Sequence, residues 1–143
     1  MVKIQIVNVV ATASVNQPMD FEELRTYGEI FHNSDVYYGR VAYFKTNQMQ
    51  GKVSIFLSGK MISVGTKSEE QANKELQLAK QFLFDKGFIK DIELVPRTQN
   101  LVVSVDFEQT LNLEELSQRT RAIYEPEQRV FTDREIKEFV ITL

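Results

Sequence analysis

The chain has 143 residues, of which 43% are hydrophobic and 26% are charged, and its formal net charge is −3. This length suits one domain or two small fused repeats, with enough apolar material for a core. Cysteine is absent, which excludes disulfides, thiolate nucleophiles and cysteine-based metal sites. No signal peptide is visible and no apolar run approaches the roughly 18–20 residues of a membrane span, so we expect a cytoplasmic protein with no membrane partner.

The first predicted element is a strand at 4–15, which is apolar and rich in β-branched residues. Strand alternation places Asn8, Val10 and Thr12 on one face and the residues between them on the other. Asp20 then predicts the start of a short helix, which Gly28 ends.

Three further strands are expected at 36–45, 52–57 and 60–66, because these segments are rich in β-branched and aromatic residues. Ser68 with Gln71 predicts the start of a longer helix, which ends at Gly87. Strands with helices gathered beside them indicate an α+β fold, in which an antiparallel sheet is covered by helices on one face.

The other face of this sheet would be open. Val10, Phe56, Ile62 and Val64 would lie on it, and a large exposed apolar face is usually a binding surface. If the assumed alternation is wrong by one residue, the same side chains are ordinary core, and the pattern leaves both interpretations open.

Charge is distributed unevenly along the chain. The segment 36–67 contains five Lys or Arg and no Asp or Glu, whereas 108–138 contains eight acids and five bases. One face can therefore be basic, as in proteins that bind nucleic acid. Asp and Glu are also depleted in β-strands generally, so composition alone does not decide whether one face is basic.

Two stretches of the sequence match without a gap, NVVATASVNQPMDFEEL at 8–24 and NLVVSVDFEQTLNLEEL at 100–116. Six of the 17 positions are identical, including Asn8 with Asn100 and Val10 with Val102. We interpret this match as a duplicated unit of about 90 residues, with a first repeat at 1–90 and a partial second repeat at 91–143.

Three segments resemble the TATA-box-binding protein family, especially its archaeal members: IVNVVATASV at 6–15, SIFLSGKMISVGTKSEEQ at 54–71 and YEPEQ at 124–128. The resemblance runs from about Ile4 to Gln128, with a fainter echo to the end of the chain. It implies a saddle of two tandem repeats, a curved antiparallel sheet with helices on the convex face. The concave face of such a saddle lies in a widened DNA minor groove, a binding mode of which this family is a standard example.

The resemblance also assigns roles to individual residues. Asn8 and Asn100 match paired asparagines that hydrogen-bond base edges, Phe56 matches an intercalating wedge, and Tyr38 falls where the partner of that wedge would be. Lys60 and Lys67 match lysines that contact phosphates. The expected DNA-binding residues are Asn8, Val10, Thr12, Tyr38, Phe56, Lys60, Ile62, Val64, Lys67, Asn100, Val102 and Ser104.

The YEPEQ segment implies a protein partner. Glu125 and Glu127 match the stirrup loop that contacts the B-type initiation factor.

The sequence departs from the family pattern at several expected DNA contacts. Tyr38 carries a hydroxyl that needs a hydrogen-bond partner between bases, Val64 replaces a threonine, and Arg129 stands where the family has a wedge phenylalanine. A second SGK segment and a second long helix are not matched, so we expect a truncated second repeat whose open sheet edges permit self-association.

We therefore expect a general transcription factor, associated with the nucleoid, that binds A·T-rich promoter DNA in the minor groove and recruits the B-type initiation factor. One alternative is a TATA-binding-protein-like module that binds protein partners or regulates transcription without bending DNA. Another is an accessory substrate-grip domain of the kind attached to ribonucleases and glycosylases. We expect His32 to be a solvated loop residue, because it lies among polar residues. No carboxylate constellation accompanies it, so we expect no enzyme, cofactor or metal site.

Overall fold

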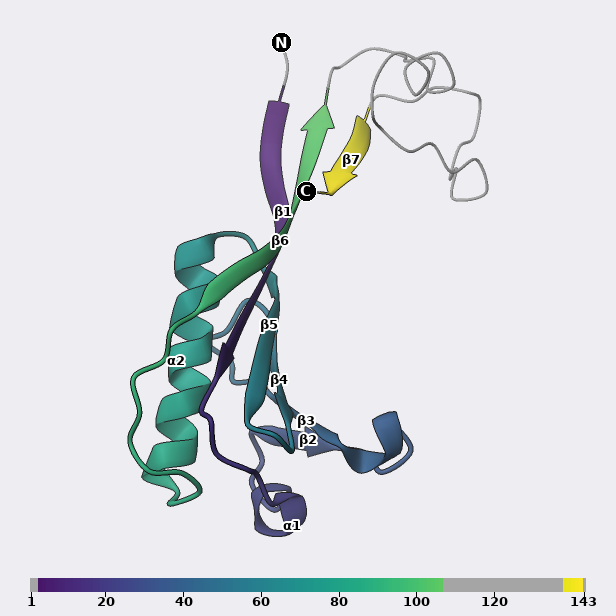
Figure 1. Cartoon of the computed structure of the whole chain (residues 1–143). Coiled ribbons are helices and arrows are strands. Elements are labelled where there is room, and N and C mark those ends of the chain that lie inside the picture. Colours follow the sequence, from purple (N-terminus) through teal and green to yellow (C-terminus); the bar gives the residue numbers. More distant parts are fainter. Residues whose placement is uncertain (1–2, 107–137, 143) are drawn as a thin grey trace. The chain divides into compact units, whose positions relative to one another are not determined.

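The computed structural model describes residues 3–106 and 138–142 (Figure 1). Glu125, Glu127 and Arg129 lie outside these residues. The chain divides into two compact units, a larger one at Val7–Leu101 and a smaller one formed by Met1–Ile6 with Val102–Leu143. The predicted repeats at 1–90 and 91–143 remain a prediction.

The larger unit is a sheet with one long helix beside it. Its strands follow the order β2-β3-β4-β5-β1-β6, and every pair of neighbours from β2 to β1 is antiparallel. The elements are β1 (Lys3–Ser14), α1 (Phe21–Leu24), β2 (Ile30–His32), a 3₁₀ helix (Tyr37–Gly39), β3 (Val41–Phe44), β4 (Lys52–Phe56), β5 (Lys60–Thr66), α2 (Glu69–Asp85) and β6 (Arg97–Asp106). In the smaller unit, β6 pairs antiparallel with β7 (Glu138–Thr142). The predicted α+β class is confirmed, with α2 along one side of the sheet (Figure 1).

The faces of β1 are those that the alternation predicts. Val9, Ala11 and Ala13 are buried, whereas Asn8, Val10 and Thr12 are half-buried. In β5 the residues alternate in the same way, because Met61 and Ser63 are buried and Ile62 and Val64 are half-buried. The possibility that Val10, Ile62 and Val64 are ordinary core is therefore wrong.

Helix α2 covers the buried face of the sheet because one stripe of its surface is apolar. The Ser68 hydroxyl caps its N-terminus by accepting a hydrogen bond from Gln71 N–H at 3.0 Å, as predicted. The stripe comprises Ala72, Leu76, Ala79 and Leu83. It shares one core with Val9, Ala11, Val53, Ile55 and Met61. Burying each leucine contributes about 1.5–3 kcal/mol, so this stripe decides which face of the sheet remains open.

The predicted strand at 36–45 is wrong over its first five residues. Tyr37, Tyr38 and Gly39 have φ values of 48°, 54° and 73°, which are not those of a strand. They form a 3₁₀ turn, closed by hydrogen bonds from Gly39 N to Val36 O at 2.9 Å and from Arg40 N to Tyr37 O at 3.1 Å. The β propensity of the tyrosines is overridden by this turn, and β3 begins only at Val41.

His32 is another correction to the sequence-based expectation. It ends β2, a strand that the sequence analysis did not predict, and its ring is half-buried. The ring packs edge-on against Phe21, with 5.4 Å between centroids, and Nε2 lies 2.9 Å from the Gly39 carbonyl oxygen. His32 therefore stabilises the Tyr37–Gly39 turn and is no solvated loop residue.

Candidate nucleic-acid interface

The face of the larger sheet that α2 does not cover is the candidate binding surface, here called the open face. Residues directly opposite each other on antiparallel strands share a face. The register places Thr12 opposite Ile62, Ile62 opposite Ser54, Ser54 opposite Tyr43, and Tyr43 opposite Phe31. One row of side chains thus crosses five strands. Residues at alternate positions along these strands share the same face. The open face is therefore defined as Asn8, Val10, Thr12, Phe31, Tyr43, Lys52, Ser54, Phe56, Ile62 and Val64.

Aromatic and basic side chains meet at the outer end of this face. Phe31 is 63% exposed, and its ring centroid lies 6.4 Å from that of Tyr43. The Lys52 ammonium lies 4.3 Å from the centroid of the Tyr43 ring, which is a cation–π contact. The sequence analysis missed Phe31, Tyr43, Lys52 and Ser54. Strand alternation back from Phe56 would have placed Ser54 and Lys52 on the same face. Phe31 and Tyr43 could be assigned only from the cross-strand register.

Asn8 lies beside an irregularity between β1 and β5. Val9 is opposite Thr66 and Ala11 is opposite Ser63, so β5 has one more residue than β1 over this step, which is a β-bulge. Gly65 lies in the bulge with a φ of +94°, which favours glycine. Its N–H donates a hydrogen bond of 2.8 Å to Asn8 Oδ1.

This hydrogen bond sets the orientation of the Asn8 amide. Because a backbone N–H can only donate, the atom that faces it must be the amide oxygen. The Nδ2 group is then left with two N–H donors, and no described residue accepts from it. A half-buried donor thus lies on β1, at the end of the open face farthest from β2.

The position of Tyr38 differs from its expected place beside Phe56. Tyr38 lies in the 3₁₀ turn and is 91% exposed, with the Arg40 guanidinium carbon 6.0 Å from its ring centroid. In the register of β3 and β4 the residue opposite Phe56 is Val41. The role of Tyr38 as a wedge partner gains no support from this register and remains a prediction.

The two lysines expected to contact phosphate lie at opposite ends of β5. Lys60 is the first residue of the strand and Lys67 follows its last residue, and both are exposed. Lys45 is also exposed, and its ammonium donates to the Gly51 carbonyl at 3.0 Å. Since 36–67 contains no acid, these charges have no acidic neighbour within the segment.

The candidate residues of β6 divide between the two units. In the larger unit Asn100 is half-buried, and since its neighbour Leu101 packs against the core, alternation places Asn100 on the opposite face. Gln99 Nε2 donates to Thr12 Oγ1 at 3.1 Å. In the smaller unit Val102 is opposite Thr142, and Ser104 is only 4% exposed.

Comparisons with known proteins agree with this architecture. The family model described as transcription factor TFIID, or TATA-binding protein, matches residues 3–85. The chain belongs to the TATA-box-binding protein family. The TATA-box-binding protein of Cenarchaeum symbiosum is 34% identical over 123 residues, which are 85% of this chain and 68% of that protein. TATA-box-binding protein F of Halobacterium salinarum is 30% identical over 129 residues, 87% of this chain and 68% of its own length. The structure of Methanococcus jannaschii TBP aligns with a TM-score of 0.74 at 24% identity, covers 98% of this chain and 87% of its own, and confirms the fold.

Membership of the TATA-box-binding protein family supports a role as a general transcription factor. The described residues contain no group of three or more His, Asp or Glu side chains that could hold a metal ion. None of the helices in the described part of the chain has the length and hydropathy that crossing a membrane requires.

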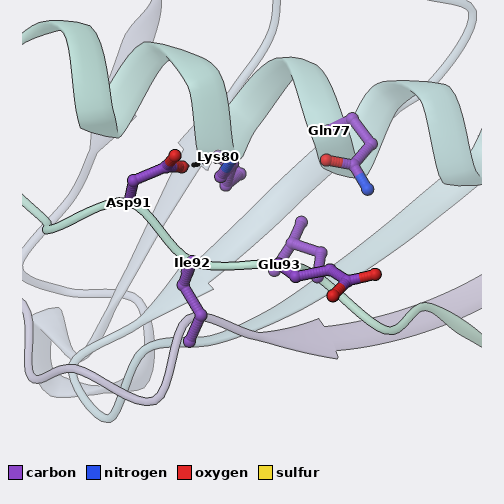
Figure 2. A pocket seen from close by; sticks show the side chains of 6 residues that line it. Gln77, Lys80, Asp91, Ile92 and Glu93 are labelled. Carbon is purple, nitrogen blue, oxygen red and sulfur yellow. Dashed lines mark ion pairs between the residues drawn. The ribbon is translucent and has the colours of Figure 1, made fainter.

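An open hollow of about 390 Å³ lies beside α2, between the helix and the segment that leads to β6 (Figure 2). Its lining consists of Gln77, Lys80, Asp91, Ile92, Glu93 and Leu94. The Lys80 ammonium and Asp91 Oδ1 are 2.7 Å apart, and a dashed line marks this ion pair in Figure 2. The lining contains none of the open-face residues, so we do not assign the hollow to the nucleic-acid interface.

The Lys80–Asp91 pair makes stability depend on pH. The hydrogen bond from Lys80 and the attraction between the two charges lower the pKa of Asp91. A carboxylate whose pKa is lower in the folded state stabilises the fold above its unfolded pKa, about 3.9, and loses this effect as the pH falls through the lowered value. The Tm difference between wild type and Asp91→Asn should therefore be fully present at about pH 6, should begin to shrink at about pH 4 and should vanish only below the lowered pKa of Asp91.

Thermal unfolding followed by circular dichroism at several pH values measures this difference. We expect it to be small, because the Asp91 side chain is 68% exposed and surface ion pairs are screened. Glu93→Gln is the matched control, since it removes an exposed charge from the same segment and leaves the Lys80–Asp91 ion pair in place. A difference for Asp91→Asn that stays constant from neutral to acid pH would contradict the prediction.

Proposed function

We propose that this protein is a general transcription factor whose open face binds A·T-rich promoter DNA in the minor groove. The observation that carries the proposal is the orientation of Asn8, whose oxygen is held by Gly65 N–H at 2.8 Å so that its Nδ2 donors are free for a ligand. In the minor groove, A·T pairs present only acceptors, whereas G·C pairs add the donor N2–H₂ of guanine. An amide that offers donors, set among Val10 and Val64, therefore favours A·T pairs over G·C pairs.

The aromatic residues of the open face suit deformation of the duplex. Phe56 lies at the end of β4 and is half-buried, so part of its ring is free to contact bases. Apolar wedges between base steps kink DNA in minor-groove binders, and this family is a standard example. The Phe31–Tyr43 pair extends the apolar surface toward β2, which lies at the edge of the larger sheet.

The charges around the open face suit a polyanion. Lys60 and Lys67 lie at opposite ends of β5 and Lys52 lies between them across the strand pair, since it is opposite Val64. Lysines at these positions would contact phosphates and set the position of the duplex without reading its sequence. Three such contacts would give a slope of log K against log salt of about −2.7.

The finer parts of the proposal rest on the family resemblance. We propose that Glu125 and Glu127 bind the B-type initiation factor and that the protein acts at the nucleoid in the cytoplasm. Self-association through open sheet edges remains a further prediction. Substitution of both glutamates, followed by a binding assay with the purified factor on preformed protein–DNA complexes, would test the first of these.

The DNA-binding proposal is tested by fluorescence titration of two duplexes of equal length, one with an A·T-rich core and one with a G·C-rich core. We expect tighter binding to the A·T-rich duplex, and an affinity that falls steeply as salt is raised from about 50 to about 200 mM. Absence of binding at both salt concentrations, or equal affinity for the two duplexes, would contradict the proposal.

A second candidate function is a module that binds protein partners without bending DNA. The position of Tyr38 favours it, because Tyr38 is 91% exposed and lies outside β3, so Phe56 has Val41 and no second aromatic directly opposite. Energy transfer between dyes at the two ends of the A·T-rich duplex separates the candidates. Binding without a change in the end-to-end distance would favour the second.

A further inference from the structure

Glu75 is a fully buried carboxylate in the middle of α2, with 0% of its surface exposed. Its Oε2 accepts hydrogen bonds from Gln50 N–H at 3.0 Å and from Gln71 Nε2 at 2.6 Å, and its Oε1 accepts from Gly51 N–H at 3.0 Å. Burying a carboxylate is costly unless such donors satisfy it. These bonds fasten the helix to the turn between β3 and β4.

The same turn rests directly on the β-bulge beside Asn8. A Cβ atom added to Gly51 would lie 2.0 Å from the Val64 carbonyl oxygen and 3.0 Å from the Gly65 carbonyl carbon. A Cβ added to Gly65 would lie 3.1 Å from Gly51 Cα. The two backbones are thus in contact with no side chain between them, and Gly65 N–H is the donor to Asn8 Oδ1.

We propose that Glu75 is a positioning residue for Asn8: it holds the β3–β4 turn against the bulge, and thereby keeps Gly65 N–H directed at the amide oxygen. The consequence for base reading rests on the proposed DNA-binding function. If the turn moves, the bulge relaxes and the amide can rotate or present its oxygen, which repels the acceptors of A·T pairs. Glu75 would then influence the preference for A·T pairs while the phosphate contacts are unchanged.

The test compares Glu75→Gln with Glu70→Gln. The first keeps the size of the side chain but replaces one acceptor oxygen by an NH₂ group that cannot accept from a backbone N–H. The second removes the same charge from an exposed position of α2. Amide hydrogen exchange of Gly65 N–H measures the linkage without DNA. We expect exchange about tenfold faster in Glu75→Gln than in wild type, and no change in Glu70→Gln.

DNA titrations of the same variants measure the consequence. We expect Glu75→Gln to reduce the ratio of A·T-rich to G·C-rich affinity about fivefold, with an unchanged salt slope, and Glu70→Gln to leave that ratio unchanged. In the Asn8→Ala background, Glu75→Gln should have no further effect on the ratio, because a residue that acts through Asn8 cannot act in its absence.

Several outcomes would overturn the inference. An equal loss of affinity for both duplexes, or the same effect of Glu75→Gln with and without Asn8, would mean that Glu75 has a structural role alone. If wild type binds neither duplex, the proposed function is wrong, and unchanged Gly65 exchange in Glu75→Gln would then still overturn the positioning role. If Glu75→Gln does not fold, Gln71→Ala removes only the 2.6 Å bond, and faster Gly65 exchange in that variant supports the linkage whereas unchanged exchange contradicts it.

Discussion

Gly51→Ala is expected to lower the free energy of unfolding by about 3 kcal/mol, at the upper end of the range for overpacking. The added methyl group would lie 2.0 Å from the Val64 carbonyl oxygen, which is backbone and cannot turn aside as a flexible side chain can. Relief requires the β3–β4 turn to move away from β5, and the two backbone hydrogen bonds to the buried Glu75 oppose that movement.

Urea unfolding followed by circular dichroism measures this loss. The matched control is Gly28→Ala, because a Cβ at Gly28 meets no atom within 4 Å. We expect the control to change stability by no more than about 1 kcal/mol, since its effect is confined to the entropy of the unfolded chain. Equal midpoints for the two variants would show that Gly51 is not confined as the structure indicates.

Phe56→Ala is expected to weaken binding of an A·T-rich duplex about fivefold to 150-fold, which corresponds to the roughly 1–3 kcal/mol lost with one aromatic contact to a base. Phe56 is a half-buried aromatic on the open face and is the proposed wedge between base steps. Its removal should also reduce the bend of the duplex, measured by energy transfer between its ends.

Phe84→Ala is the control for this variant. Phe84 is 39% exposed and lies on α2, outside the open face, so its removal deletes a similar apolar group without touching the proposed interface. We expect Phe84→Ala to bind DNA as wild type does. If Phe56→Ala retains both the affinity and the bend of wild type, Phe56 is no wedge.

Much of the fold could be predicted from the sequence, because the relevant signals are local. The Ser68 cap and the apolar stripe from Ala72 to Leu83 define α2 without reference to any other element. Alternation in β1 likewise separates Val9 from its half-buried neighbours. Where long-range contacts override local propensity the prediction failed, as at Tyr37 and Tyr38.

The candidate interface was only partly accessible from the sequence. Asn8, Ile62 and Val64 were expected on the open face, and their alternation confirms that they lie there. Their contact with DNA remains a prediction. Phe31 and Tyr43 were missed, because their shared place depends on the pairing of β2 with β3, which no local pattern specifies.

The sequence by itself determined α2 and the strands β1, β4 and β5, which side of β1 is buried, and the family resemblance, since these follow from residue types at short spacing. Only the tertiary structure decided what the polar residues do. No local pattern in the sequence distinguishes Glu75, yet it is buried, because the two N–H groups that satisfy it come from a turn 24 and 25 residues away. The orientation of the Asn8 amide depends in the same way on Gly65, 57 residues away in the sequence. Such a hydrogen bond forms only when the fold brings two distant segments together, so no local pattern predicts it.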